Sequence, residues 1–205
     1  MPKSQRTSHT DVDVAAAVLC GDAFYQLAQL FIRSIPADRA EAASYAASNV
    51  GQMSAASVNL AFALEIFLKA LIAGTGKSFP SEHSLLNLFD ELRPDVQEQI
   101  KAAFDSATNG QRTSDVETGG FLVEVSRGPP KQAAGSAKPF PKGVRALLQR
   151  NEKNFVAWRY VFSCETKEGF PLSFEFGNMN VLAQILRSCF PVAAGAHAQP
   201  HAAIG

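Results

Sequence analysis

Two charged side chains, Glu65 and Lys69, interrupt a stretch that is otherwise apolar from Ser57 to Ala73. They are four residues apart with the acid first, which is the spacing and order that favour an ion pair on one side of a helix. A charge is costly to bury unless it is paired. The pair therefore indicates either a polar binding site at the centre of the fold or a structural ion network with Arg159 as a further partner of Glu65. We favour the structural network.

His83 is the histidine within the predicted fold, because His9, His197 and His201 fall in the two ends of the chain. A lone histidine can act as an acid or a base, but the sequence shows no nucleophile or metal partner beside it. The alternative, which we favour, is that its side chain helps to start a helix at Ser84. The three cysteines have no C-x-x-C spacing, so the sequence predicts no disulfide framework, no metal site and no cofactor.

Basic residues gather between Arg127 and Arg150 with no acidic residue among them. They are Arg127, Lys131, Lys138, Lys142, Arg145 and Arg150. The first four lie in a Pro-, Gly- and Lys-rich loop, residues 127–143, which we expect to be mobile. A mobile basic loop that leads into a basic helix start could follow a phosphate backbone. The alternative is a loop whose charges are merely solvated.

Arg159 and Tyr160 form a second candidate for binding, because they stand next to Trp158 in a segment rich in aromatic residues. Arginine beside aromatic side chains can hold a phosphate while a base stacks on a ring. The same residues can instead lock two helices together inside the fold. We favour the internal lock.

The segment GTGKSF at residues 74–79 looks like part of a phosphate-binding loop but fails both requirements of that motif. Alignment of G-x-x-x-x-G-K-[ST] on Gly76 and Lys77 puts Leu71 where the first glycine belongs. Such a loop also follows a strand and opens a helix, whereas this segment follows a helical pattern and precedes Pro80. We predict instead a helix end at which glycine takes a positive φ.

The composition suits a globular protein with one domain or at most two small ones. Of the 205 residues, 46% are hydrophobic, which is enough to build a sizeable core. The 19 basic residues balance the 19 acidic ones, so no field of the whole molecule attracts nucleic acid or a membrane. The sequence shows neither a signal peptide nor a run of about 18 uncharged apolar residues, so we expect a cytoplasmic protein without a membrane span.

Helical spacing of apolar residues predicts most of the secondary structure. The first expected helix runs from a cap at Thr10 or Asp11 to Pro36, and the second from Asp38 to Ala73 with a bend at 51–54. A short third helix begins at a cap at Ser81 or Ser84, and a fourth begins near Pro94. The fifth runs from Val144 to about Ser163, and the last from a cap at Asn178 to Pro191. We expect a single helical domain over residues 10–190, a flexible tail over 1–9 and a disordered tail over 191–205.

Two short segments alternate in the manner of strands. In GFLVEVS, residues 120–126, and in LSFEF, residues 172–176, every second side chain is apolar, which is the period of a strand. We expect them to pair as a small two-stranded antiparallel β ribbon beside the helices. The predicted fold class is therefore mainly α, a multi-helix bundle with this ribbon attached.

The chain resembles the HEPN (higher eukaryotes and prokaryotes nucleotide-binding) superfamily over roughly residues 45–190, most closely from 57 to 92. The elements that carry the resemblance are an apolar helix with E-x-x-x-K near its end, a short turn, His83 followed by Leu85, and a leucine-rich helix. The late segment NFVAWRYVF, 154–162, resembles the aromatic Arg-Tyr segment of such proteins. The resemblance implies an up-and-down helical bundle, commonly a homodimer, which cleaves or binds RNA. It also implies a toxin–antitoxin or defence setting, sometimes with a nucleotidyltransferase as partner.

Ribonucleases of this superfamily carry R-x(4–6)-H, and no arginine of this chain has a histidine at that spacing. We therefore expect a homodimeric HEPN-like module without the usual nuclease motif, which binds RNA, a nucleotide or a partner protein. Two alternatives stay open. One is a divergent ribonuclease whose residues the motif does not reveal, and the other is a purely structural interaction protein.

Overall fold

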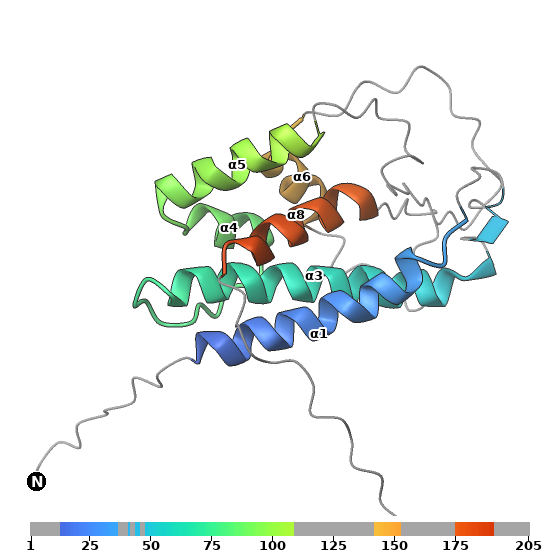
Figure 1. The fold of residues 1–205 in the computed structure, drawn as a ribbon, viewed down its shortest axis with the longest axis horizontal. Helices are drawn as coiled ribbons and strands as arrows, with labels where there is room; N and C mark the ends of the chain where they lie inside the picture. The colour runs from blue at the N-terminus through green and yellow to red at the C-terminus, as the bar shows by residue number, and fades with distance from the viewer. Residues whose placement is uncertain are drawn as a thin grey trace, which may run out of the picture.

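The structure is a computed structural model, and helices make up most of the part that it describes (Figure 1). The described residues are 13–36, 41, 44–45, 48–108, 142–152 and 175–190. Within them the helices are α1 (Val14–Ile32), α3 (Val50–Ala73), α4 (Leu85–Asp90), α5 (Pro94–Thr108), α6 (Val144–Asn151) and α8 (Phe176–Ser188). The prediction of a mainly α bundle is confirmed.

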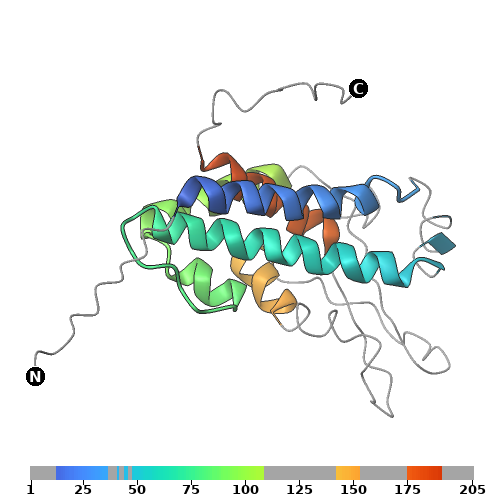
Figure 2. The same cartoon turned by 90° about the horizontal axis from the view of Figure 1, so that it is seen from below.

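Helix α3 is the central element of the bundle. Its residues Leu60, Leu64, Phe67 and Leu68 have no exposed surface. Helix α1 lies along α3 in both views, and α8 packs on α3 and α5, while α4 packs on α3 and α6 (Figures 1 and 2). A helix that is apolar on all sides takes this central place because only there can each side find an apolar neighbour.

Helix α1 approaches α3 closely at a glycine. Gly21 is buried, and a Cβ built on it would lie 2.5 Å from Cε1 of Phe67. One turn further on, the rings of Phe24 and Phe62 are 5.3 Å apart between centroids. The lack of a side chain at Gly21 therefore makes room for the Phe67 ring against α1.

Several predicted helix ends agree with the structure. Ser84 caps α4 by accepting a hydrogen bond from the Asn87 backbone N–H, and Pro94 is the first residue of α5. Helix α3 ends at Ala73, and Gly76 follows it with a φ of 83°. This is the helix end with a positive-φ glycine that the sequence predicted in place of a phosphate-binding loop.

The predicted starts of α1 and α8 and one predicted bend were wrong. Asp13, not Thr10 or Asp11, caps α1, because its Oδ1 accepts a hydrogen bond from the Ala16 N–H at 3.0 Å. Residues 51–54 are helical rather than bent, since Met53 and Ser54 are buried against the core.

Helix α8 was also predicted to begin too late. It starts at Phe176, two residues before the expected cap Asn178, whose side chain donates to Glu175 instead of capping. Phe176 was placed in a strand, but it is helical and fully buried, with its ring 6.0 Å from that of Phe31. Burial against Phe31 therefore fixes Phe176 in the first turn of α8.

The β ribbon remains a prediction. The part of the chain that the structure describes contains no strand, and residues 120–126 and 172–174 lie outside it. The tails 1–9 and 191–205, most of the loop 127–143, and the extension of the helix from 153 to Ser163 also lie outside the described residues.

Two described helices are long and apolar enough to cross a membrane by length and composition alone. They are Val14–Ile32, of which 22% of the apolar window is buried, and Gly51–Ala73, of which 67% is buried. Each contains at least one charged residue, so neither is an uncharged apolar run of about 18 residues. Burial of α3 is what a core helix requires, whereas α1 leaves much apolar surface uncovered.

Candidate functional site

The two charged residues of the central helix form a buried ion pair. Glu65 Oε1 and Lys69 Nζ are 2.9 Å apart, and each side chain is less than a tenth exposed. Two charges taken out of water lose their hydration, and further hydrogen bonds must offset that cost. The site is built from the groups that supply them.

His83 is one of these groups. Its Nδ1 lies 2.9 Å from the same oxygen of Glu65 that Lys69 contacts. The imidazole is 71% exposed, whereas the Glu65 side chain is 8% exposed. A buried carboxylate thus holds one edge of an exposed ring and leaves the other edge accessible to solvent.

The contact between His83 and Glu65 differs from the sequence expectation. His83 was expected to help start α4, but Ser84 caps that helix and the His83 ring turns to α3. Arg159 was the expected partner of Glu65 and lies outside the described residues. A contact between residues 18 positions apart has no local signal, although the resemblance of segment 57–92 had named both residues.

Glu82 shapes the turn that presents His83. Its carboxylate accepts hydrogen bonds from the backbone N–H groups of His83 (2.7 Å) and Ser84 (2.8 Å) and from the Asn87 side chain (3.1 Å). These donors, led by the Ser84 N–H and followed by Asn87 and the His83 N–H, lower the pKa of Glu82 to about 2. The turn is therefore fixed by an ionised side chain that sequence reasoning did not single out.

Phe79 covers the other end of the ion pair. Lys69 Nζ lies 5.6 Å from the centroid of the Phe79 ring, a distance at which a cation is attracted to the ring face. Phe79 is itself 37% exposed. Beside it, a hollow of about 580 Å³ is lined by Lys77, Phe79, Glu82 and Glu91 among others. An aromatic and an imidazole surface therefore flank the same buried pair.

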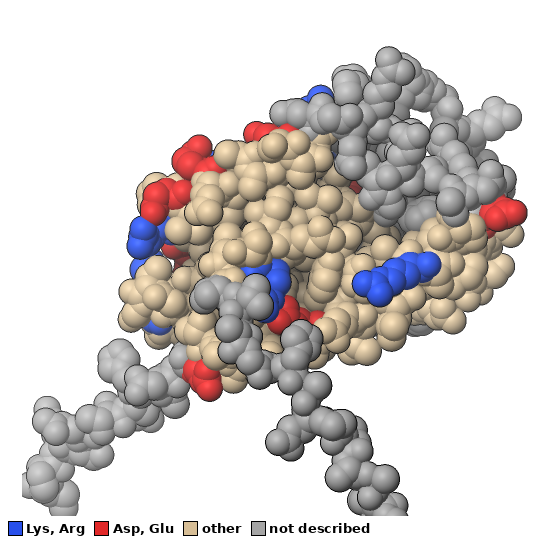
Figure 3. Space-filling view, viewed as in Figure 1, with Lys and Arg blue, Asp and Glu red and all other residues tan. Residues whose placement is uncertain are grey.

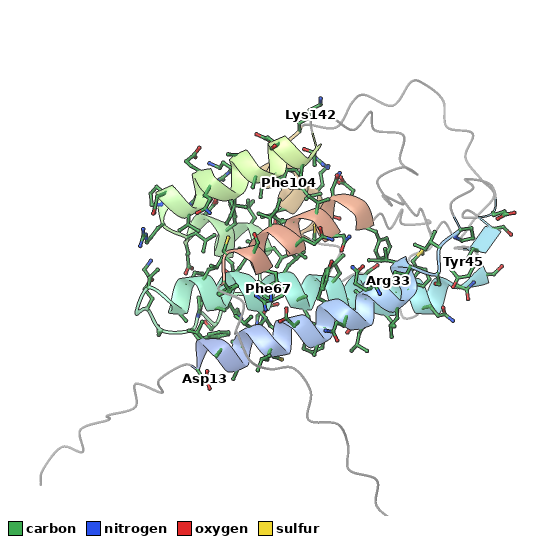
Figure 4. The ribbon with its side chains drawn as sticks, in the orientation of Figure 1. Asp13, Arg33, Tyr45, Phe67, Phe104 and Lys142 are labelled. Carbon is green, nitrogen blue, oxygen red and sulfur yellow. The ribbon has the colours of Figure 1, made fainter. Side chains whose placement is uncertain are left out.

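Helix α6 carries the described members of the basic run. Lys142, just before α6, is exposed at the margin of the bundle (Figure 4). Arg145 forms an ion pair with Asp90, the last residue of α4. Arg150 donates to Glu175 through Nε at 2.8 Å and through Nη2 at 3.1 Å. Two of the three described basic residues are thus engaged within the fold.

A hydrogen bond between Ser84 and Glu152 links the end of α6 to the candidate site. Ser84 Oγ donates to Glu152 Oε1 at 2.8 Å, so the residue after His83 touches the end of α6. Glu65, Lys69 and His83 come together, whereas Arg145 and Arg150 bind acids of other elements. The remaining candidates, Arg127, Lys131, Lys138, Arg159 and Tyr160, lie outside the described residues.

This arrangement can orient an imidazole and offer a stacking surface. A carboxylate that hydrogen bonds to one nitrogen fixes the direction of the other, which can then exchange a proton or donate to an anion. Within the described ranges no group of three or more His, Cys, Asp and Glu side chains is arranged to hold a metal ion.

Comparison with known proteins gives one match. Residues 36–118, which include α3, α4 and α5, match the family model described as HEPN domain. No curated protein and no solved structure matches the chain. The match includes Glu65, Lys69 and His83 but neither α6 nor α8.

Proposed function

Because residues 36–118 of this chain form a HEPN domain, we propose that it is an RNA- or nucleotide-binding module whose contact surface surrounds His83. The observation that carries the proposal is the exposed imidazole held by the buried carboxylate of Glu65. The contact buries little of the ring in the core, since most of the His83 surface stays in water. A fixed orientation is instead what recognition of a ligand requires.

Two neighbours supply the other contacts that a nucleotide needs. Phe79 exposes part of a ring on which a base can stack, and Lys77 in the same loop is exposed and cationic. His83 then faces the phosphate or sugar. Bases of any type have a face that can stack, so this surface favours single-stranded RNA without strong sequence preference.

The basic loop acts in this proposal as a second contact. Lys142 is exposed and can contact a phosphate. Arg145 and Arg150 could do so only after their ion pairs with Asp90 and Glu175 break. Of the basic run, Arg127, Lys131, Lys138 and Lys142 therefore carry the proposed phosphate contacts. Arg159 and Tyr160 remain candidates to hold a phosphate and stack a base, and Arg159 remains the proposed further partner of Glu65.

Binding of a fluorescently labelled single-stranded RNA at low and moderate salt tests the proposal. We expect affinity to fall about ten-fold or more for a few-fold rise in salt if several phosphates are contacted. Phe79→Ala should weaken binding by about 1–3 kcal/mol, the usual value of one stacked base. Lys101→Ala, in α5 where the lysine pairs with Glu98, removes one positive charge and serves as a control with near-normal affinity.

The outcomes separate the proposed module from the structural alternative. Binding that is lost in His83→Ala and Phe79→Ala but kept in Lys101→Ala supports the module. A protein that binds neither RNA nor free nucleotides at low salt would contradict it and leave an interaction protein.

The same geometry favours a second candidate function. An imidazole oriented by a carboxylate is the arrangement of a general base, and RNA carries its own nucleophile in the 2′-hydroxyl. A divergent ribonuclease would cleave the labelled RNA, lose that cleavage in His83→Ala, and keep its RNA affinity. Intact RNA after long incubation with the wild-type protein would rule this candidate out.

The wider setting follows from the family. In this proposal the protein works as a cytoplasmic homodimer in a toxin–antitoxin or defence system, with a nucleotidyltransferase-type protein as partner. What supports these points is the HEPN domain alone. Co-purification of a tagged copy from its own cells, with identification of the bound proteins, tests the partner.

A further inference from the structure

Helix α1 exposes an apolar face that the rest of the bundle does not cover. Among the described residues the exposed large apolar side chains are Leu19 (61%), Leu27 (51%), Leu30 (71%) and Phe79 (37%), so three of the four lie on α1. Ala16 and Ala23 are exposed as well. With 3.6 residues per turn, these five α1 residues fall on one side of the helix, centred on Ala23. Exposed apolar surface of this kind marks an interface.

The opposite side of α1 is fixed to the bundle. Arg187 of α8 donates to Asp22 at 2.6 Å, the Gln29 side chain donates to Asn180, and Gly21 faces Phe67. These contacts hold α1 in place along the lower edge of the bundle in Figure 1. The helix therefore presents its apolar face on a surface that is anchored to the bundle.

The spacing of the five residues about Ala23 is the same in both directions, so it is preserved in an antiparallel copy. If two α1 helices cross with Ala23 opposite Ala23, Leu19 of one copy lies level with Leu27 of the other. In the same register the small Ala16 lies level with the large Leu30. Small residues opposite large ones let side chains interdigitate, and alanine at the centre lets the two backbones come close. One surface thus complements itself, as a two-fold interface demands.

Charge supports the antiparallel direction. Asp13 caps the first turn of α1 and Arg33 follows its last turn, at the two ends of the helix (Figure 4). Where undescribed residues do not cover it, the surface between these ends is mostly neither basic nor acidic in Figure 3. Antiparallel packing brings the acidic end of one helix to the basic end of the other, whereas parallel packing would bring like charges together.

We propose that α1 forms the interface of a homodimer, in which a second copy of this chain packs antiparallel about a two-fold axis at Ala23. Leu30 lies between two grooves, one of about 850 Å³ toward α8 and one of about 330 Å³ toward α3. The second copy would therefore pack on a ridge at Leu30 that has a groove on each side. The inference rests on the homodimer of the proposed function and names its surface. Its test uses no RNA, so RNA binding and dimer formation can fail independently.

The first measurement is the mass in solution by light scattering. The wild-type protein is expected at twice the chain mass of 22.0 kDa. Ala23→Glu places two like charges face to face at the axis and should weaken the dimer about 100-fold or more. Ala102→Glu, at an exposed alanine of α5, is the matched control and should remain a dimer. Circular dichroism of both variants confirms that each is folded.

Single cysteines test the register. In a background in which Cys20, Cys164 and Cys189 are replaced, Ala23→Cys should form a covalent dimer under mild oxidation. Two copies of residue 23 meet at the axis, with backbones close enough for a disulfide. Ala16→Cys should not cross-link, because its two copies lie about 21 Å apart along the helices at 1.5 Å per residue.

Several results would overturn the proposal. One is a dimer that cross-links through Ala16→Cys but not Ala23→Cys, and another is a dimer that Ala23→Glu leaves intact. A monomer that sediments with phosphatidylcholine vesicles would show that a lipid bilayer, and not a second copy, covers the apolar face of α1. A monomer whose Ala23→Cys thiol reacts slowly with a labelling reagent would make a segment of the same chain the occupant.

Discussion

Gly21 of α1 lies against the ring of Phe67 of α3, so close that a Cβ on the glycine would come within 2.5 Å of a ring carbon. Phe67 is fully buried and has no room to withdraw. The missing side chain of Gly21 therefore sets the distance between α1 and α3, the two longest of the described helices.

Gly21→Ala should destabilise the protein, because the added methyl group must push α1 and α3 apart or displace the Phe67 ring. Overpacking of this kind costs about 1–3 kcal/mol, more than the helix gains by exchanging glycine for alanine. Gly51→Ala is the matched control. It lies in the exposed first turn of α3 with nothing within 4 Å of its new Cβ, so it should stabilise by up to about 1 kcal/mol. Urea unfolding of both variants measures the difference, and equal effects would contradict the close approach.

The Glu65–Lys69 pair should matter for stability, whereas His83 should matter little. Lys69→Met leaves the Glu65 carboxylate buried without its lysine partner, and loss of one member of a buried pair costs about 3–5 kcal/mol. His83→Ala removes a mostly exposed ring and should cost less than about 1 kcal/mol. Thermal unfolding followed by circular dichroism tests both. A large loss in His83→Ala would show that the histidine is structural and would weaken the proposed site.

Glu82 should make stability depend on acid. Hydrogen bonds from Ser84, Asn87 and His83 lower its pKa from 4.5 to about 2 in the folded protein, so below pH 4.5 the unfolded chain binds the proton more readily. The contribution of Glu82 is therefore present above about pH 4.5 and is lost as pH falls toward 2. In Glu82→Gln the fall in unfolding free energy across this range should be smaller than in the wild type. Carboxyl NMR of Glu82 gives its pKa directly, and a value near 4.5 would contradict the three-donor arrangement.

Ser84→Ala should loosen the start of α4 by about 1 kcal/mol, the usual cost of removing a helix cap. The same substitution removes the hydrogen bond to Glu152 and so frees the end of α6. Ser81→Ala changes an exposed serine three residues earlier and is the control, with an expected effect within about 0.5 kcal/mol. Amide hydrogen exchange in Leu85 to Phe89 measures the effect on α4. Unchanged protection in that helix would show that the cap is dispensable.

Helices whose apolar spacing is strong could be predicted from the sequence, because burial decides them. The apolar stretch from Ser57 to Ala73 became the central helix, and Ser84, Pro94 and Gly76 acted as their types suggest. The start of α8 could not be predicted. Its alternating residues fit a strand, but Phe176 packs on Phe31, a contact between residues far apart in the chain.

The candidate site was predictable only in part, for the same physical reason. Glu65 and Lys69 are neighbours on one helix, so their pairing follows from local spacing. The contact of Glu65 with His83, and those of Arg145 with Asp90 and Arg150 with Glu175, join different elements. No local pattern encodes such contacts, which is why Asp90 and Glu175 did not stand out in the sequence.

The ion pair between Arg150 and Glu175 has a consequence for how the chain could be divided. It links the last turn of α6 to the residue before α8, across 24 intervening positions, and both side chains are mostly shielded from water. Helix α8 is therefore held in the bundle by its contacts with α3 and α5 and by this ion pair, as well as by the covalent chain. A gene cut between the codons of residues 153 and 174 should yield two fragments that reassemble when they are produced together. Reassembly of the two fragments would then report whether two proteins fused to the new ends have come together.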